Sequence, residues 1–394
     1  MFICLVGISL SARDIVYKVS TYGDDANDGL TWATAKRTLG AAQAVAEYGD
    51  DIWVAAGTYY PTDGEYRYRW GGNSDNSVRY FSFQLKAGVR IYGGFPKSGN
   101  PDMNKRDFVT NKTIFSGNIG DSSKNTDNSY MVFRNSDSKI DDLTVLDGVY
   151  IQDGYTDLKN EKCSGLYNVN SSPLIRNTTF INNYGGAVWN DYSSAIFSEC
   201  SFISNSGTSN HQGTAIYVSV GTVNITNSKF DSNSGVALYL KGNVTISGCN
   251  FEKNNTVIKT YTSATVSISN CSFKNNSGTS LLFNDSGDEN ITITNCSFEK
   301  NTGLPINGIH DGSTVSNCTF TGNSSSSTGC IRMSGGTVSN CTFTENSSDS
   351  IGAVSLSDGT ITNCTFIRNS ASIAGAISMY NGILTNSTFI GNKA

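Results

Sequence analysis

Apolar and polar residues alternate in short stretches that recur every 21 to 28 residues from residue 175 onwards. Each stretch contains a phenylalanine, an apolar residue five positions before it and an asparagine three positions after it. The ten phenylalanines are Phe180, Phe202, Phe230, Phe251, Phe273, Phe298, Phe320, Phe343, Phe366 and Phe389. Since alternate residues of a strand face the same side, this pattern predicts short β-strands, and the repeats lack the period of a helix.

A second asparagine, three positions before the phenylalanine in eight of the ten repeats, lies where the alternation breaks. Asparagine tolerates the left-handed backbone conformation, so we expect it to bend the chain there. A cysteine, serine or threonine follows it and shares a face with the phenylalanine. Two consecutive repeats place these residues at Asn317, Cys318, Phe320 and Asn323, and at Asn340, Cys341, Phe343 and Asn346. We expect equivalent residues to stack in ladders.

A repeat of about 23 residues that turns corners and returns in register predicts one rung of an all-β parallel β-helix. Leucine-rich repeats have a similar length, but these repeats contain few leucines. Rungs stack at ~4.8 Å, so nine intervals give a solenoid of roughly 43 Å.

The N-terminal half divides into three further parts. Residues 1–12 resemble a secretory signal peptide without its basic region, a short buried strand being the alternative. Within residues 13–60, the alanine-rich stretch 33–47 predicts a short α-helix that caps the solenoid, and "IWVAAGTY" predicts the first strand. Residues 61–165 predict irregular early rungs with insertions, before the regular rungs of 166–394.

The two ends of the chain bear on where the protein acts. No stretch after the N-terminal segment is long and apolar enough to span a membrane. The sequence stops at "FIGNKA", inside a rung, so we expect either a longer natural chain or a partner that covers the last rung.

The repeat motifs resemble those of the polymorphic outer-membrane proteins of chlamydiae and related bacterial surface proteins. That family combines Phe-x-x-Asn with Gly-Gly-Ala-[Ile/Leu/Val]. Here "GGAV" begins at Gly185, and looser versions begin at Gly213, Gly235, Ile351 and Ala374. The stretches "FQLKAGVRIYGGF" and "LTVLDGVYIQDG" are also similar to secreted bacterial β-helix proteins. The resemblance implies a right-handed single-stranded parallel β-helix of the pectin-lyase-like superfamily, with adhesion and cell-surface display.

Composition and charge narrow the classes of partner. The net charge is −5, the sequence pI is about 5.1 and no basic stripe appears, which argues against a nucleic-acid partner.

Seven of the 10 cysteines share one repeat position, which serine or threonine fills in the other three repeats. We therefore expect free, buried thiols, with disulfides between neighbouring rungs as the alternative. One thiol per rung does not provide a zinc cluster.

Two non-repeat segments are candidate sites. The insertion "EYRYRWGGNSDNSVRYF" clusters aromatic and basic residues that favour binding a glycan or a host or cell-surface protein, unless they seal the side of the solenoid. These residues are Tyr66, Arg67, Tyr68, Arg69, Trp70, Arg79 and Tyr80. An acidic stretch offers Asp141, Asp142, Asp147 and Asp153 as possible Ca²⁺ ligands, although turn aspartates are the simpler interpretation. We predict no other cofactor.

The predicted function is that of a secreted, outer-membrane or cell-surface β-helix acting as an adhesin-like binding or structural module. A polysaccharide lyase or glycoside hydrolase is the alternative, because related folds host such enzymes. Those reactions need converging carboxylates or a carboxylate beside a basic residue, and no charged residue of 301–394 recurs at one rung position next to a partner. The pair His310-Asp311 is interpreted as a turn rather than a catalytic dyad.

Overall fold

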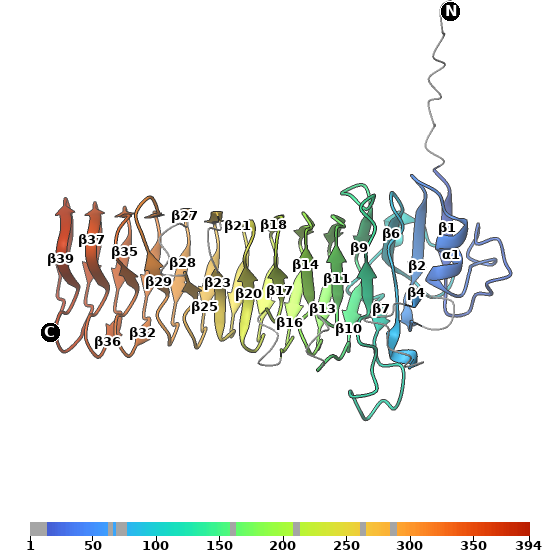
Figure 1. Ribbon diagram of the computed structural model, residues 1–394, viewed down its shortest axis with the longest axis horizontal. Coiled ribbons are helices and arrows are strands. Elements are labelled where there is room, and N and C mark those ends of the chain that lie inside the picture. Colours follow the sequence, from blue (N-terminus) through green and yellow to red (C-terminus); the bar gives the residue numbers. More distant parts are fainter. Residues whose placement is uncertain are drawn as a thin grey trace, which may run out of the picture.

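The computed structural model is an elongated stack of parallel strands that runs from the N-terminal cap to the last rung (Figure 1). It describes residues 14–61, 66–67, 77–157, 163–207, 213–260, 265–283 and 290–394. Each regular rung contributes three short strands, which pair in parallel with the equivalent strands of the rungs on either side. This architecture is the predicted parallel β-helix.

Three ladders of strands run the length of the solenoid. The first ladder contains β8 (Phe133–Asn135), β11 (Leu166–Val169), β14 (Val188–Asp191), β17 (Ile216–Val218), β20 (Val236–Leu240), β23 (Thr256–Thr260), β26 (Leu281–Leu282), β29 (Ile306–Ile309) and β33 (Ile331–Met333). The second contains β1 (Val16–Val19), β2 (Asp51–Ala55), β6 (Arg90–Phe95), β9 (Val145–Asp147), β12 (Leu174–Arg176), β15 (Ile196–Ser198), β18 (Thr222–Thr226), β21 (Asn243–Ser247), β24 (Thr265–Ser269), β27 (Asn290–Thr294), β30 (Thr314–Ser316) and β34 (Thr337–Ser339). The long strands β37 (Val354–Thr362) and β39 (Ile377–Thr385) extend both ladders. The third contains β3 (Gly57–Tyr59), β7 (Thr113–Ser116), β10 (Tyr150–Gln152), β13 (Thr179–Ile181), β16 (Ser201–Ile203), β19 (Lys229–Asp231), β22 (Asn250–Glu252), β25 (Ser272–Lys274), β28 (Ser297–Glu299), β31 (Thr319–Thr321), β35 (Thr342–Thr344), β38 (Thr365–Ile367) and β40 (Thr388–Ile390).

The remaining elements are short and lie outside the three ladders. They are α1 (Leu39–Val45), the 3-10 helices η1 (Val78–Tyr80) and η2 (Met103–Lys105), the antiparallel pair β4 (Tyr66–Arg67) and β5 (Phe81–Ser82), and the parallel pair β32 (Ser324–Ser325) and β36 (Ser347–Ser348). No helix in the part of the chain that the structure describes has the length and apolar character of a membrane span.

The corner between the second and third ladders is made by the residue three positions before each phenylalanine. At all ten corners this residue has a positive φ, near +50° for the asparagines. The ten residues are Asn177, Glu199, Asn227, Gly248, Asn270, Asn295, Asn317, Asn340, Asn363 and Asn386. The left-handed conformation lets the apolar residue before the corner and the phenylalanine after it both face inward, as the broken alternation predicts.

The phenylalanines form one continuous stack through the core. Neighbouring rings lie 4.6 to 4.9 Å apart between centroids and are almost parallel. Nine of the ten rings are buried, and Phe389 of the last rung is half exposed. The stack supplies apolar contact on both faces of every internal ring, so it is the main apolar contribution of each rung.

The asparagine three positions after each phenylalanine forms a hydrogen-bonded ladder inside the solenoid. In a typical rung, the Nδ2 amide of Asn301 donates to Asn323 Oδ1 at 2.9 Å and to the carbonyl of Phe273 at 3.0 Å. The same Asn323 Oδ1 also accepts from the backbone N–H of Asn301. The pattern continues from Asn183 to Asn392. The asparagines three positions after each phenylalanine stack inward, whereas Asn317 and Asn340, three positions before it, bend the chain with their side chains exposed.

The seven repeat cysteines lie as a buried column next to the phenylalanine stack, and the nine described cysteines, which include Cys163 and Cys330, are all free thiols. Each sulfur of the column lies close to backbone groups of its own and neighbouring rungs. Cys318 Sγ donates to the Ser316 carbonyl, and Cys341 Sγ accepts from the Cys318 N–H at 3.4 Å. The cysteine side chain therefore occupies a small apolar niche where serine serves equally well, as at Ser228.

We expect the buried thiols to resist alkylation in the native protein, because burial keeps the reagent from reaching them. Burial raises the pKa of Cys200 to about 12 and the pKa of Cys330 well above its usual value. A raised folded-state pKa stabilises the fold below the unfolded pKa of about 9, and this contribution is lost as pH rises towards 12. In a Cys4→Ser variant, labelling by iodoacetamide at pH 8 should be negligible until denaturant is added, and the unfolding free energy should fall above pH 9. Rapid labelling of the native protein would contradict this prediction.

The N-terminal cap differs from its prediction in detail. The helix α1 covers only Leu39–Val45 of the predicted stretch, because Lys36 pairs with Val19 in extended conformation and Thr38 caps the helix. Leu39 and Ala42 are buried in the end of the core, so α1 closes the solenoid as expected. The first strand is β1, which precedes α1, and "IWVAAGTY" supplies β2 and β3 instead.

Candidate functional site

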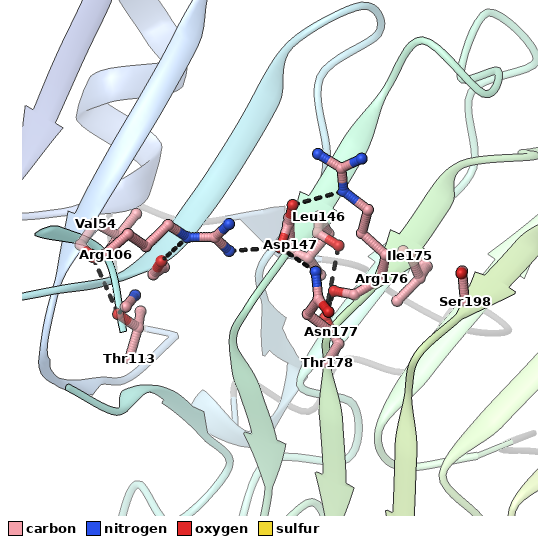
Figure 2. Close-up of polar contacts among 12 residues, drawn as sticks. Val54, Arg106, Thr113, Leu146, Asp147, Ile175, Arg176, Asn177, Thr178 and Ser198 are labelled. Atoms are coloured by element: carbon pink, nitrogen blue, oxygen red, sulfur yellow. Dashed lines mark hydrogen bonds and ion pairs between the residues drawn. The ribbon is translucent and has the colours of Figure 1, made fainter. Parts of the chain in front are cut away.

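A buried ion-pair cluster lies on the outer side of the second ladder, at the junction of β9 and β12 (Figure 2). Asp147 is 1% exposed and receives Arg106 Nη2 on Oδ1 and Arg176 Nε on Oδ2, each at 2.5 Å. The Nδ2 amide of Asn177 donates to the same carboxylate at 3.0 Å. Both carboxylate oxygens are therefore occupied by donors from this chain.

The cluster ties an insertion to the rungs. Arg106 follows η2 in the connection between β6 and β7, and its Nε also donates to the Gly93 carbonyl. Its guanidinium passes over Gly148, where a Cβ atom would lie 2.1 Å from Arg106 Nη2. Gly148 has a φ of +71° as well, so both the close approach and the turn require glycine.

In the structure, the four aspartates of the predicted Ca²⁺ site lie in separate environments. Asp147 binds arginines, Asp142 is exposed, and Asp141 accepts the Leu143 N–H in a turn. Asp153 accepts from Gln152 Nε2 at 2.6 Å. No group of three or more histidine, cysteine or acidic side chains suited to a metal occurs among the described residues. The four aspartates do not converge.

The aromatic insertion is described only in part. Tyr66 and Arg67 pair through their backbones with β5, whereas Tyr68, Arg69 and Trp70 lie outside the described residues. Tyr80 is buried and packs against Tyr130, at 4.9 Å between ring centroids.

Arg79 is fixed beside Tyr80. Its guanidinium lies 3.8 Å from the centroid of the Tyr130 ring, and Arg79 Nε donates to the Asn128 carbonyl at 2.6 Å. A further hydrogen bond joins Arg79 Nη2 to the Tyr155 carbonyl. Arg79 and Tyr80 therefore take the place expected under the alternative interpretation, in which the insertion seals the side of the solenoid.

The structure brings together a different set of aromatic residues, on the outer side of the first ladder. Tyr167, Trp189, Tyr217 and Tyr239 occupy equivalent positions in β11, β14, β17 and β20. The rings of Trp189 and Tyr217 stack at 3.7 Å, and those of Tyr217 and Tyr239 at 5.3 Å. We call these four residues the aromatic column.

Cationic side chains flank the aromatic column. Arg134 lies 5.8 Å from the Tyr167 ring, Lys241 lies 5.9 Å from Tyr217, and Lys259 lies 5.8 Å from Tyr239. The tyrosine rings are buried against their neighbours and Trp189 is half-buried. Because the three tyrosine rings are only 3 to 7% exposed, the surface of the column consists mainly of the half-buried Trp189 and the flanking cationic side chains.

A simple sequence signal marks the aromatic column. In three of its rungs, the aromatic residue directly follows the motif that begins with Gly185, Gly213 or Gly235. The last residue of that motif is buried, so alternation turns the next side chain outward. The motif by itself does not mark a site, because it also occurs in rungs without an aromatic residue after it, such as those that begin at Ile351 and Ala374.

Two other outward carboxylates, those of Asp191 and Asp51, also accept hydrogen bonds from this chain. Asp191 accepts from Ser219 Oγ and from Tyr167 Oη. Asp51 pairs with Arg90 Nε at 2.6 Å. Burial raises the pKa of the Asp51 carboxyl, and the nearby Arg90 opposes this shift. Together with the ion pairs of Asp147, these contacts support a structural or binding role for the three carboxylates, rather than a converging acid pair.

The only histidine in the described residues, His310, lies beside Ser334, whose Oγ is 2.8 Å from its Nδ1. The following Asp311 and Gly312 form an exposed turn, as predicted for "IHDG". His211 lies outside the described residues.

The sequence matches a family model described as the right-handed β-helix region over residues 164–310 and 302–394. No curated protein sequence matches the chain significantly. The match agrees with the parallel ladders and confirms the predicted fold, including its hand. The narrower resemblance to polymorphic outer-membrane proteins stays a prediction.

Solved structures of other proteins share the fold. They include pectate lyase Pel9A, with 14% identity over 95% of this chain and 79% of that chain and a TM-score of 0.42. A rhamnogalacturonan lyase has 14% identity over 94% and 87%, with a TM-score of 0.38. PfbA, a surface adhesin of Streptococcus pneumoniae, has 14% identity over 89% and 86%, with a TM-score of 0.35.

Proposed function

The chain belongs to the right-handed β-helix family, and on this basis we propose that it is a secreted or cell-surface binding module that holds an acidic glycan along its first ladder. The observation that carries the proposal is the aromatic column with its three flanking cations. Aromatic residues beside arginine or lysine commonly form binding surfaces.

The geometry of the column suits an extended chain of sugars. From Arg134 to Lys259 the column spans five intervals between rungs, or roughly 24 Å at the usual strand spacing. An extended polysaccharide whose sugar units repeat at a spacing similar to that of the rungs can therefore contact several rungs at once. Positive charge at both ends favours acidic groups on the glycan, and the overall negative charge of the protein disfavours indiscriminate binding of polyanions.

We expect a Lys241→Ala/Lys259→Ala variant to bind acidic polysaccharides roughly 10-fold more weakly than the wild type, because each cationic contact contributes about 0.5 to 1 kcal/mol or more. Affinity electrophoresis against a panel of acidic and neutral polysaccharides measures the change. Arg332→Ala is the matched control, since Arg332 is exposed in the same outward column, beyond the aromatic residues. Equal losses in both variants, or no wild-type binding, would count against the proposal.

A polysaccharide lyase or hydrolase remains the alternative class, and Asp51 is the described carboxyl that favours it because of its raised pKa. Incubating the protein with each bound polymer and measuring soluble fragments separates the two functions. We expect no release above the buffer control. Release that disappears in an Asp51→Asn variant would establish the enzyme instead.

A further inference from the structure

The loop between β7 and β8 contains an unusual concentration of buried acceptor oxygens. Its neck is closed by the Ser129 N–H, which donates to the Gly117 carbonyl at 2.7 Å. Three side-chain oxygens of this neck region, Asn118 Oδ1, Asp127 Oδ1 and Asn128 Oδ1, are buried and have no hydrogen-bond partner among the residues that the structure describes. Buried acceptors almost always have a partner, so three in one loop require an explanation.

The orientation of the Asn128 side chain is fixed by the protein. Asn128 is 3% exposed, and its Nδ2 amide donates to the Asp153 carbonyl at 2.7 Å. The amide cannot be turned around without losing that hydrogen bond, so Oδ1 is an acceptor without a donor. The backbone carbonyl of Asn128 is already held by Arg79.

Asp127 is the negatively charged residue among these three. Its Oδ2 accepts the Asp121 N–H at 2.8 Å, whereas its Oδ1 is buried without a donor. The nearest lysine of the loop, Lys124, pairs with Asp121 instead, at 3.0 Å. Gly120 lies against the carboxylate, since a Cβ atom there would be 2.4 Å from Asp127 Oδ2. The loop is thus built around a carboxylate oxygen whose charge is not compensated within it.

We propose that this loop binds a calcium ion through Asp127 Oδ1, Asn118 Oδ1 and Asn128 Oδ1. One carboxylate and two amide oxygens are hard ligands of the kind that Ca²⁺ prefers, and backbone carbonyls and water complete its shell of 6 to 8 oxygens. A single water molecule donates only two hydrogen bonds and leaves the carboxylate charge unbalanced. Mg²⁺ retains most of its own water and fits a site of several protein oxygens less well.

A route to the site is present at the surface. A depression of about 340 Å³ is lined by Tyr60, Asn118, Ile119, Gly120 and Ser122, so it borders the Asn118 side of the loop. The bound ion would order the loop that carries Asn128, and through it Arg79 and the sealed side of the solenoid. This inference does not depend on the proposed glycan.

The test is calorimetric titration of the metal-free full chain with CaCl₂ and, separately, with MgCl₂. We expect one saturable Ca²⁺ site per chain, weaker Mg²⁺ binding and a higher thermal midpoint with Ca²⁺. Asp127→Asn keeps the shape but removes the charge, and should lower Ca²⁺ affinity roughly 10- to 100-fold. Asp121→Asn is the matched control, because it removes an exposed acid of the same loop that pairs with Lys124.

Several results would overturn the proposal. They are no saturable binding by the wild type, unchanged affinity in Asp127→Asn, or equal losses in Asp127→Asn and Asp121→Asn, which would show surface charge attraction alone. If circular dichroism shows that Asp127→Asn is unfolded, Asn118→Ala carries the test, because it removes a neutral ligand at the edge of the loop. Weakened Ca²⁺ binding by a folded Asn118→Ala variant supports the site, and wild-type affinity refutes it.

Discussion

We expect the Asn301→Ala variant to lose about 3 to 5 kcal/mol of stability in the rungs around β28, because it leaves buried groups without partners that cost roughly 1 to 3 kcal/mol each. Asn301 Oδ1 accepts from both the backbone N–H and the Nδ2 amide of Asn276, each at 3.0 Å. Its own Nδ2 donates to the Phe273 carbonyl and to Asn323. Alanine replaces none of these contacts, and no water reaches a fully buried site to replace them.

Hydrogen–deuterium exchange and chemical denaturation measure the Asn301→Ala effect. Each rung contacts chiefly its neighbours, so protection should fall in β25, β28 and β31 and stay near the wild-type level in distant β11. Asn317→Ala is the matched control, since Asn317 is exposed and loses only its preference for the left-handed conformation, about 1 kcal/mol. Similar losses for Asn301→Ala and Asn317→Ala would show that the ladder adds little.

The second large effect is expected for Asp147→Ala, which should destabilise the early rungs by about 3 to 5 kcal/mol. The substitution leaves the largely buried guanidinium of Arg106 without its anion and also removes the partner of Arg176 and Asn177. The connection that carries Arg106 then loses its attachment to β9. Thermal unfolding and proteolysis of that connection report the change.

A double variant separates an ion pair from a packing effect. Asp147→Ala/Arg106→Ala should recover part of the lost stability, because the penalty comes mainly from the uncompensated buried cation. Glu345→Ala is the exposed counterpart: Glu345 pairs with Arg368 across rungs at 2.7 Å, and its loss should cost at most about 1 kcal/mol. A Glu345→Ala loss as large as that of Asp147→Ala would contradict this account.

The repeats were predictable because their information is local. Each rung carries its own apolar residues, corner asparagine and inward asparagine, and neighbouring rungs repeat them in register. The parity of side chains along a strand decides which residues face the core, so Phe320 and Asn323 could be placed inside from spacing alone. The exposure of the Asn317 side chain could not be predicted in the same way. A position at a bend shows where the chain turns, but not whether other residues cover the side chain.

The candidate sites depended on contacts between distant residues. From the sequence, Asp147 is a possible calcium ligand. In the structure it pairs with Arg106, which lies 41 residues earlier in the chain, in the connection between β6 and β7. Tyr80 looked exposed because the sequence does not show that η1 packs against Tyr130. The orphaned oxygens around Asn128 were equally hidden, since a lack of partners is a property of the folded loop.

The sequence by itself determined the period, the corners, the inward columns and hence the parallel β-helix, because strand parity and the left-handed asparagine act over a few residues. The tertiary structure alone decided which outward residues meet: the arginines around Asp147, the stacked rings from Tyr167 to Tyr239, and the acceptors of the loop at Asp127. The physical reason is that stacking rungs and returning insertions bring together residues 20 to 50 positions apart. Burial and charge compensation, which give those residues their chemistry, exist only after that assembly.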